Sequence, residues 1–306
     1  MSSKSQKILV TGASGFIGRH VIARLLAQNC EVHAVSRRKY EETRNHVRWW
    51  VADLVDIDRV QEIVTTIAPD KIIHLASLVS GNRSADFVMP ALRNNFLSAV
   101  HLMLAATSLR GTRVILAGSM EEPGPAGDSQ VPVSPYAAAK WAASGYSKMF
   151  HALYGLDVVN VRIAMVYGPG QTDSGKLIPY VIRSLLSGET PKLGSGKRSV
   201  DWVYVEDVAD GLVRACFSDM ADRDTLDLGS GELIPIREVV ERLATIINPS
   251  IVPCFGELPD RAHERDWFAD VTATEERIAW QATTSLDNGL SKTVNWYRDN
   301  IGLDEK

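Results

Sequence analysis

The 306-residue chain has few cysteines, no excess of basic charge and no long hydrophobic run. Cys30, Cys216 and Cys254 are odd in number and lack metal-ligand spacing, so we expect ordinary thiols in a reducing compartment. The 33 basic and 37 acidic residues give a net charge of −4, which disfavours a nucleic-acid partner. No apolar stretch approaches the roughly 20 residues of a membrane span, and no signal-peptide core follows the N-terminus. These absences favour a cytoplasmic protein without a metal site.

In the first half of the chain, short β-branched runs alternate with segments whose apolar residues recur at helical spacing. This alternation predicts an α/β fold, with a Rossmann-type doubly wound parallel sheet covered on both faces. Beyond residue 163 the elements shorten, and Gly and Pro become more frequent. We therefore expect a dinucleotide-binding lobe at residues 1–163 and mainly a smaller C-terminal substrate-binding lobe at 164–306, with some segments returning to the first lobe. The expected strands are 7–10, 31–35, 47–52, 71–76, 113–118 and 157–163.

A glycine-rich segment, TGASGFIG, follows the first expected strand directly and opens a helical pattern. Gly12, Gly15 and Gly18 allow a tight turn and a close backbone approach to a pyrophosphate at the helix N-terminus. A structural turn without a ligand is the alternative. The strand before the glycines and the helix after them favour dinucleotide binding.

The second expected strand ends in Ser36, Arg37 and Arg38, where such a fold binds the adenosine ribose. An acidic residue there would accept a hydrogen bond from the ribose of NAD, whereas arginine pairs with the 2′-phosphate of NADP. We therefore expect NADP(H), with NAD(H) as the alternative; the arginines could instead belong to a solvated loop. Asp53, after the third strand, could reach the adenine amine or simply close a turn or cap a helix.

Three side chains are candidates for proton and hydride chemistry. Tyr136 and Lys140 are four residues apart, hence on one face of an expected helix, and a nearby ammonium lowers the pKa of a phenol. Ser119 ends the fifth expected strand, at the sheet edge where ligands bind in this fold class. A hydroxyl there could hold a carbonyl oxygen while Tyr136 donates its proton.

Several motifs in order give the chain a family resemblance: TGASGFIG, YAAAK, VRIAMVYGPGQ and DWVYVEDVADGL. The chain resembles the extended short-chain dehydrogenases/reductases of the nucleotide-sugar epimerase/dehydratase kind. The resemblance implies that a nucleotide-diphosphate sugar is the substrate and that Lys140 holds the ribose and tunes Tyr136. It also implies further dinucleotide-site residues, among them an asparagine that the family uses structurally: Ser14, Phe16, Ile17, Leu54, Leu75, Ala76, Ser77 and Asn95.

The stretch GSMEEPG bears on the reaction. It resembles a dehydratase motif in which an acidic residue directly follows the hydroxyl residue, but Met120 stands at that place here. A thioether cannot donate a proton, so 4,6-dehydration is disfavoured. Glu121 resembles the glutamate of a Ser-x-Glu motif in 4-keto sugar reductases and is a candidate catalytic and substrate-binding residue; a solvated loop carboxylate is the alternative.

The expected function is therefore NADPH-dependent reduction of the 4-keto group of a nucleotide-activated 4-keto-6-deoxy sugar. The alternative is a nucleotide-sugar 4-epimerase that holds its NAD tightly, because hydride leaves and returns within one turnover. A non-catalytic NADP-binding regulator is a third interpretation, which the presence of Ser119, Tyr136 and Lys140 disfavours.

The resemblance also suggests substrate and subunit contacts. Lys176, Arg198 and Arg261 are expected to bind the substrate, with Arg261 as the preferred ligand of the diphosphate and Arg265 as its substitute. Arg198 would replace a diphosphate-binding arginine of the family, because Val200 stands at that place here. Two long expected helices, 91–109 and 135–154, are expected to pair with their mates in a homodimer. Their apolar faces could instead be ordinary core against the sheet.

Overall fold

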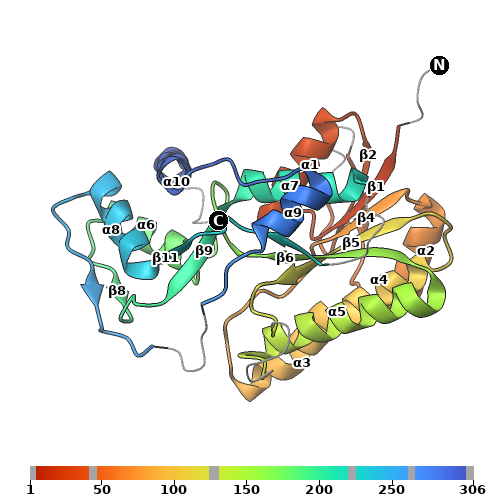
Figure 1. Cartoon of the computed structure of the whole chain (residues 1–306), viewed down its shortest axis with the longest axis horizontal. Coiled ribbons are helices and arrows are strands. Elements are labelled where there is room, and N and C mark those ends of the chain that lie inside the picture. The colour runs from red at the N-terminus through yellow and green to blue at the C-terminus, as the bar shows by residue number, and fades with distance from the viewer. Residues whose placement is uncertain (1–4, 41–46, 124–130, 220–224, 261–265, 301–306) are drawn as a thin grey trace. The chain divides into compact units, whose positions relative to one another are not determined.

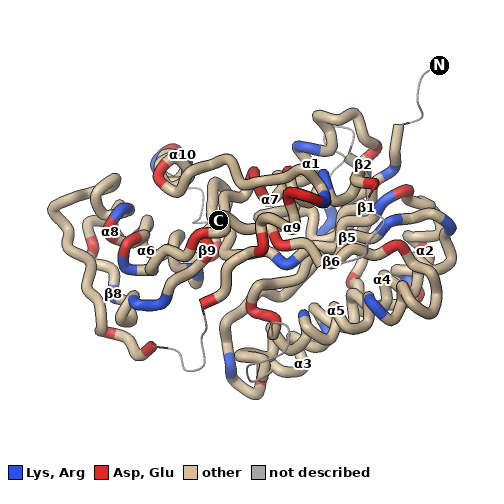
Figure 2. Tube along the Cα trace, viewed as in Figure 1, with Lys and Arg blue, Asp and Glu red and all other residues tan. Residues whose placement is uncertain are grey.

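The structure is a computed structural model that describes residues 5–40, 47–123, 131–219, 225–260 and 266–300. The chain divides into two compact units, each built from three segments. The first unit is Met1–Ile163, Ala209–Asp227 and Thr272–Trp280, and the second is Ala164–Val208, Leu228–Val271 and Gln281–Lys306. Acidic and basic residues are interspersed along the described trace of both units (Figure 2). No helix within the described ranges is long and apolar enough to cross a membrane.

A seven-stranded sheet forms the centre of the first unit (Figure 1), in the order β10-β6-β5-β4-β1-β2-β3. Its strands are β1 (Lys7–Thr11), β2 (Glu31–Ser36), β3 (Val47–Val51), β4 (Lys71–His74), β5 (Arg113–Ser119), β6 (Asp157–Ile163) and β10 (Leu226–Leu228). The pairs from β3 through β6 are all parallel. The order reverses beside β1, which defines the topological switch point of a doubly wound sheet. The expected fold class is confirmed, and each of the six expected strands begins at the expected residue.

Helices cover both faces of this sheet (Figure 1). On one face lie α1 (Phe16–Ala27) and α7 (Val205–Phe217), joined by an ion pair between Arg24 and Asp210. On the other face lie α2 (Ile57–Ile67), α4 (Ser98–Ala106) and α5 (Pro135–Tyr154). Because both faces are covered, strands such as β5 are buried along their whole length and read as continuous apolar runs.

The helix expected at 91–109 differs from the structure. It comprises α3 (Val88–Ala91), a π-helical segment η2 (Leu92–Leu97) and α4, which ends at Ala106. Asn95 lies in the π-helical turn and is buried; its side-chain amide accepts a hydrogen bond from Leu78 N at 2.6 Å and donates one to Leu78 O at 3.1 Å. We attribute the wider turn to these bonds, since π-bulges commonly place a functional side chain.

The second unit has small sheets and its own core. Its strands are β7 (Met165–Tyr167), β8 (Lys192–Leu193), β9 (Ser199–Tyr204), β11 (Leu233–Pro235) and β12 (Cys254–Phe255), in the orders β11-β9-β7 and β12-β8. Its helices are α6 (Leu177–Leu186), α8 (Ile236–Ile247) and α10 (Leu286–Asn300). The remaining elements of the described chain are η1 (Ala85–Phe87) and α9 (Val271–Ile278). The core of this unit includes Ile182, Trp202 and Leu243.

Candidate active site

The glycine turn connects β1 to α1 and requires glycine at two positions. Gly12 has a φ of 65°, and a Cβ there would lie 2.6 Å from the backbone nitrogen of Ala76. A Cβ on Gly18 would overlap the carbonyl oxygen of Gly12, so α1 could not pack on the turn. Gly15 is the N-cap of α1 and no side chain caps the helix. The first helical turn therefore keeps its N–H groups without a side-chain acceptor, which fits the pyrophosphate of a dinucleotide.

The other residues expected at the dinucleotide lie along the same edge of the sheet. Ser14, Phe16 and Ile17 belong to the glycine turn and the start of α1. Leu75, Ala76 and Ser77 directly follow β4, and Leu54 is buried beyond the end of β3. The Asp53 carboxylate accepts a hydrogen bond from Val55 N at 3.1 Å, so this side chain closes a turn; the cap of α2 is Asp56.

Ser36, Arg37 and Arg38 lie where β2 ends. The Ser36 hydroxyl accepts a hydrogen bond from Arg38 N at 3.1 Å, which bends the chain out of the strand. Both arginine side chains are exposed at this edge. An exposed guanidinium at the end of the second strand can pair with an anionic group on the ribose of a dinucleotide.

The candidate catalytic residues meet at the carboxyl edge of β5. Ser119 ends this strand, and Tyr136 lies in the first turn of α5, where Ser134 is the N-cap. Ser119, Tyr136 and Lys140 are each at most 9% exposed. Ser119 and Ser77 lie close enough to the phenol of Tyr136 to lower its pKa, and Lys140 Nζ donates to Ala117 O at 2.7 Å. The structure therefore brings together the three residues that the sequence indicated.

Burial shifts the pKa values of both α5 residues in the direction of their neutral forms. Desolvation raises the pKa of Tyr136, and the charges of Glu121 and Glu122 raise it further, against the hydrogen bonds to Ser119 and Ser77. Desolvation lowers the pKa of Lys140 to about 8, against the attraction of Glu122. The net shift of the Tyr136 pKa is opposite to the sequence-based expectation, because burial outweighs the nearby hydrogen-bond donors.

Two acidic residues follow Ser119, and they differ in environment. Glu121 is half-buried, and its backbone N–H donates to the Ser119 hydroxyl at 3.2 Å. Glu122 is 4% exposed, and its carboxylate accepts a hydrogen bond from Ser119 N at 2.7 Å. The sequence analysis singled out Glu121 and missed Glu122. No local signal in the sequence distinguishes the two glutamates, because the turn from Ser119 to Glu122 decides which one folds inward.

A second buried group that the sequence analysis missed is His74, at the end of β4. Its Nδ1 lies 2.8 Å from the Thr11 hydroxyl, and its Nε2 has no hydrogen-bond partner in the described structure. Desolvation, followed by the charge of Lys140, lowers the pKa of His74 to about 3, so the imidazole is neutral. Because His74 is neutral, Lys140 provides the positive charge in this part of the site.

The residues expected at the nucleotide diphosphate belong to the second unit. Lys176 is the N-cap residue of α6, and Arg198 directly precedes β9. Both side chains are half-buried. Arg261, the preferred diphosphate ligand, and Arg265 lie outside the described residues.

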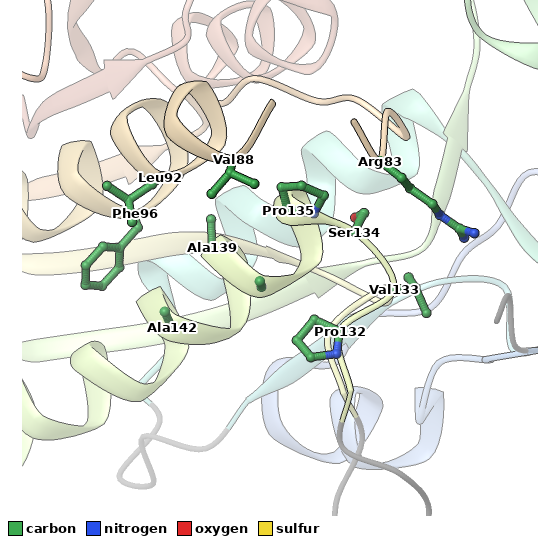
Figure 3. Close-up of a pocket in the computed structure, with 11 residues that line it drawn as sticks. Arg83, Val88, Leu92, Phe96, Pro132, Val133, Ser134, Pro135, Ala139 and Ala142 are labelled. Atoms are coloured by element: carbon green, nitrogen blue, oxygen red, sulfur yellow. The ribbon is translucent and has the colours of Figure 1, made fainter. Parts of the chain in front are cut away.

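A pocket of about 540 Å³ lies on the α3–α5 side of the first unit (Figure 3). Val88, Leu92 and Phe96 line it from α3 and η2, and Ala139 and Ala142 line it from α5. Ser119, Tyr136 and Lys140 do not belong to the lining of this pocket. The lining is mainly apolar but includes Arg83 and Ser134.

A doubly wound sheet, a glycine turn and a buried Ser–Tyr–Lys cluster define a dinucleotide-dependent enzyme of the extended short-chain dehydrogenase/reductase class. The chain belongs to the NAD-dependent epimerase/dehydratase family, whose family model matches residues 8–227. The resemblance stated from the motifs is thereby confirmed.

Characterised relatives cover nearly the whole chain. It is 33% identical over 313 residues to a UDP-glucose 4-epimerase of Mycolicibacterium smegmatis, covering 96% of this chain and 99% of the relative. The crystal structure of a UDP-glucose 4-epimerase of Thermotoga maritima with UDP-glucose superimposes with a TM-score of 0.86 at 25% identity, covering 96% of this chain and 99% of that one. A Thermus thermophilus UDP-glucose 4-epimerase in complex with NAD superimposes with a TM-score of 0.82 at 26% identity, covering 95% and 99%.

Proposed function

We propose that the protein is a nucleotide-sugar 4-epimerase acting on a UDP-hexose with retained NAD. The observation that carries the proposal is the buried Ser119–Tyr136–Lys140 cluster at the edge where the glycine turn fits a dinucleotide. Relatives along the full chain that are UDP-glucose 4-epimerases support this reading better than the reductase that the sequence analysis favoured.

The glycine turn and the N-terminus of α1 would hold NAD, which would supply the hydride acceptor and donor for the sugar C4. Tyr136, in its tyrosinate form, takes the proton of the C4 hydroxyl as the hydride leaves, and the phenol so formed gives the proton back as the hydride returns. Ser119 donates a hydrogen bond to the C4 oxygen and holds it beside the phenol. Lys140, positively charged below pH of about 8, stabilises the tyrosinate that must be present before the first half-reaction.

The test is conversion of UDP-glucose to UDP-galactose by the purified protein without added cofactor, with release of NAD on denaturation. Tyr136→Phe should lower turnover at least about 100-fold, the usual scale for a general acid–base group. The matched control is Tyr154→Phe, an exposed tyrosine at the end of the same helix, which should keep full turnover. Failure of the wild-type protein to epimerise a panel of UDP-hexoses would refute the proposal.

A second candidate is NADPH-dependent reduction of a nucleotide-activated 4-keto-6-deoxy sugar, and the exposed Arg37 and Arg38 favour it. If these arginines bind a 2′-phosphate, Arg37→Ala should weaken NADPH binding by about 10–100-fold, the range of a charge-assisted hydrogen bond, and leave NADH binding unchanged. Arg48→Ala is the control, since this exposed arginine on β3 pairs with Glu31. Equal affinity of the wild type for NADH and NADPH would exclude the NADP reading.

We also propose that the protein is a homodimer. Leu92 of η2 and Trp141 and Tyr146 of α5 are exposed apolar side chains on the two segments expected to pair, and the exposed Val88 and Met89 of α3 directly precede the first segment. Light scattering at micromolar concentration should give twice the chain mass, and a concentration-independent monomer would contradict the proposal. Cytoplasmic localisation stays a prediction.

A further inference from the structure

Glu122 is a buried carboxylate with a donor on each oxygen. Its Oε1 accepts from Ser119 N and its Oε2 accepts from the Ser144 hydroxyl of α5, both at 2.7 Å. Its own backbone N–H donates to Ser119 O at 3.1 Å, so a tight turn folds the side chain back on the strand end. The carboxylate therefore ties the end of β5 to the middle of α5.

The surroundings are shaped to hold this carboxylate. A Cβ on Gly118 would lie 2.6 Å from Glu122 Oε1, so the residue before Ser119 lacks a side chain where the carboxylate lies. Ser144 is itself placed by a buried polar chain, because Ser147 Oγ donates to Ser144 O and Asn160 Nδ2 donates to Ser147 Oγ. A buried polar group with this many partners is specified by the fold.

Glu122 and Lys140 bridge the same two elements. Ser144, which donates to Glu122, is four residues after Lys140 on α5, and Glu122 and Lys140 both bond to the backbone at the end of β5, at Ser119 N and Ala117 O. Lys140 is 3% exposed, and Glu122 provides the electrostatic attraction that opposes the desolvation of its ammonium. The other titratable groups near Lys140 are the neutral His74 on β4 and Tyr136 one turn earlier on α5. Glu121 acts on Tyr136, and it is half-buried.

We propose that Glu122 is a positioning residue: its buried carboxylate fixes Ser119 at the end of β5 and is the counter-charge of Lys140. Its catalytic consequence rests on the proposed function, whereas its electrostatic role does not. Without this negative charge, Lys140 would lose its proton at lower pH. Without the hydrogen bond to its N–H group, Ser119 would no longer be held beside Tyr136.

The electrostatic role is tested by unfolding, without any substrate. Glu122→Gln should lower the unfolding midpoint at pH 7, and the loss should shrink by pH 9.5, because the counter-charge matters only while Lys140 is protonated. In a Lys140→Met background the same substitution should have a smaller effect at pH 7, as expected for two coupled groups. A Glu122→Gln chain that folds only in the Lys140→Met background would also support the role. An equal loss at both pH values and in both backgrounds, or failure to fold in both, would overturn it.

The positioning role is tested by turnover as a function of pH. Glu122→Gln should lower kcat at least tenfold at pH 7.5. It should also move the alkaline limb of the kcat–pH profile about one pH unit lower, which is the size of the pKa shift that one nearby charge produces. Glu122→Asp keeps the charge but shortens the reach to Ser119, so it should lower kcat without moving the limb. Ser144→Ala removes only the outer hydrogen bond and should also leave the limb in place. An unmoved limb in Glu122→Gln would refute the counter-charge, and absence of wild-type turnover would refute the proposed function while the unfolding result still stands.

Discussion

Replacing Lys140 by methionine should stabilise the protein at neutral pH while removing its activity. Lys140 is 3% exposed, and its pKa of about 8 compares with an ordinary value of 10.5. The charged form of Lys140 is therefore less stable in the folded chain than in the unfolded chain, and it lowers the free energy of unfolding. Methionine has a similar length and carries no charge into the same buried space.

The size of the effect follows from linkage. Between pH 8 and 10.5 the unfolded chain binds more protons at this residue than the folded chain, so stability from this group rises with pH over that window. The cost of the charged lysine is about 3 kcal/mol at pH 7 and about 1 kcal/mol at pH 9.5. Methionine leaves Ala117 O without its donor, which costs about 1 kcal/mol at every pH. The free energy of unfolding of Lys140→Met should thus exceed that of the wild type by about 2 kcal/mol at pH 7 and equal it at pH 9.5.

Urea unfolding of the wild type and the variant at the two pH values measures this difference. Lys148→Met is the matched control, since Lys148 is exposed on the same helix, and its stability difference should be near zero at both pH values. A Lys140→Met protein that is less stable than the wild type at pH 7, or whose advantage does not shrink with pH, would refute the reasoning.

Three further substitutions or modifications have defined outcomes. Asp227→Asn breaks a buried bidentate pair with Arg162, whose two N···O distances are 2.7 Å, and should cost about 3–5 kcal/mol in urea unfolding; a cost below about 1 kcal/mol would contradict the pairing. Gly12→Ala places a Cβ against Ala76 N and should abolish copurification of a dinucleotide; retention of the cofactor would count against the turn as its site. A thiol reagent should modify one cysteine of the native protein, Cys254, because Cys30 and Cys216 are buried. Reaction of Cys30 or Cys216 as fast as that of Cys254 would contradict their burial.

The strands and the family could be predicted because their signals are local. Both faces of the sheet are covered, so the strand interiors appear in the sequence as unbroken apolar runs. The four-residue spacing of Tyr136 and Lys140 places both on one face of any helix, so it could be interpreted without knowing the rest of the fold. The π-helical turn around Asn95 could not be predicted, because its cause is a hydrogen bond to Leu78, a residue on another segment. Helical periodicity alone gives no sign of such a turn.

The choice between two adjacent glutamates illustrates a different limit. Glu121 and Glu122 are chemically identical, and only the backbone turn after Ser119 decides which one folds into the interior. Likewise, the four-residue spacing of Tyr136 and Lys140 says nothing about burial. Their pKa directions therefore emerged only once the packing around α5 was known.

These pKa directions also bear on the choice between the two candidate reactions. A reductase needs Tyr136 only as a proton donor, and burial together with the charge of Glu121 favours the neutral phenol that can donate. An epimerase first needs Tyr136 as the tyrosinate that accepts the proton of the C4 hydroxyl, so its oxidative half-reaction depends on an ammonium that stabilises this anion. Lys140 can provide this only if its Nζ turns from Ala117 O toward the phenol when ligands fill the site. Reduction of a 4-keto sugar should therefore stay level as pH rises past about 8, because the raised pKa of Tyr136 keeps its phenol neutral. An oxidation limited by tyrosine deprotonation should instead first rise with pH, so measuring both profiles separates the two functions.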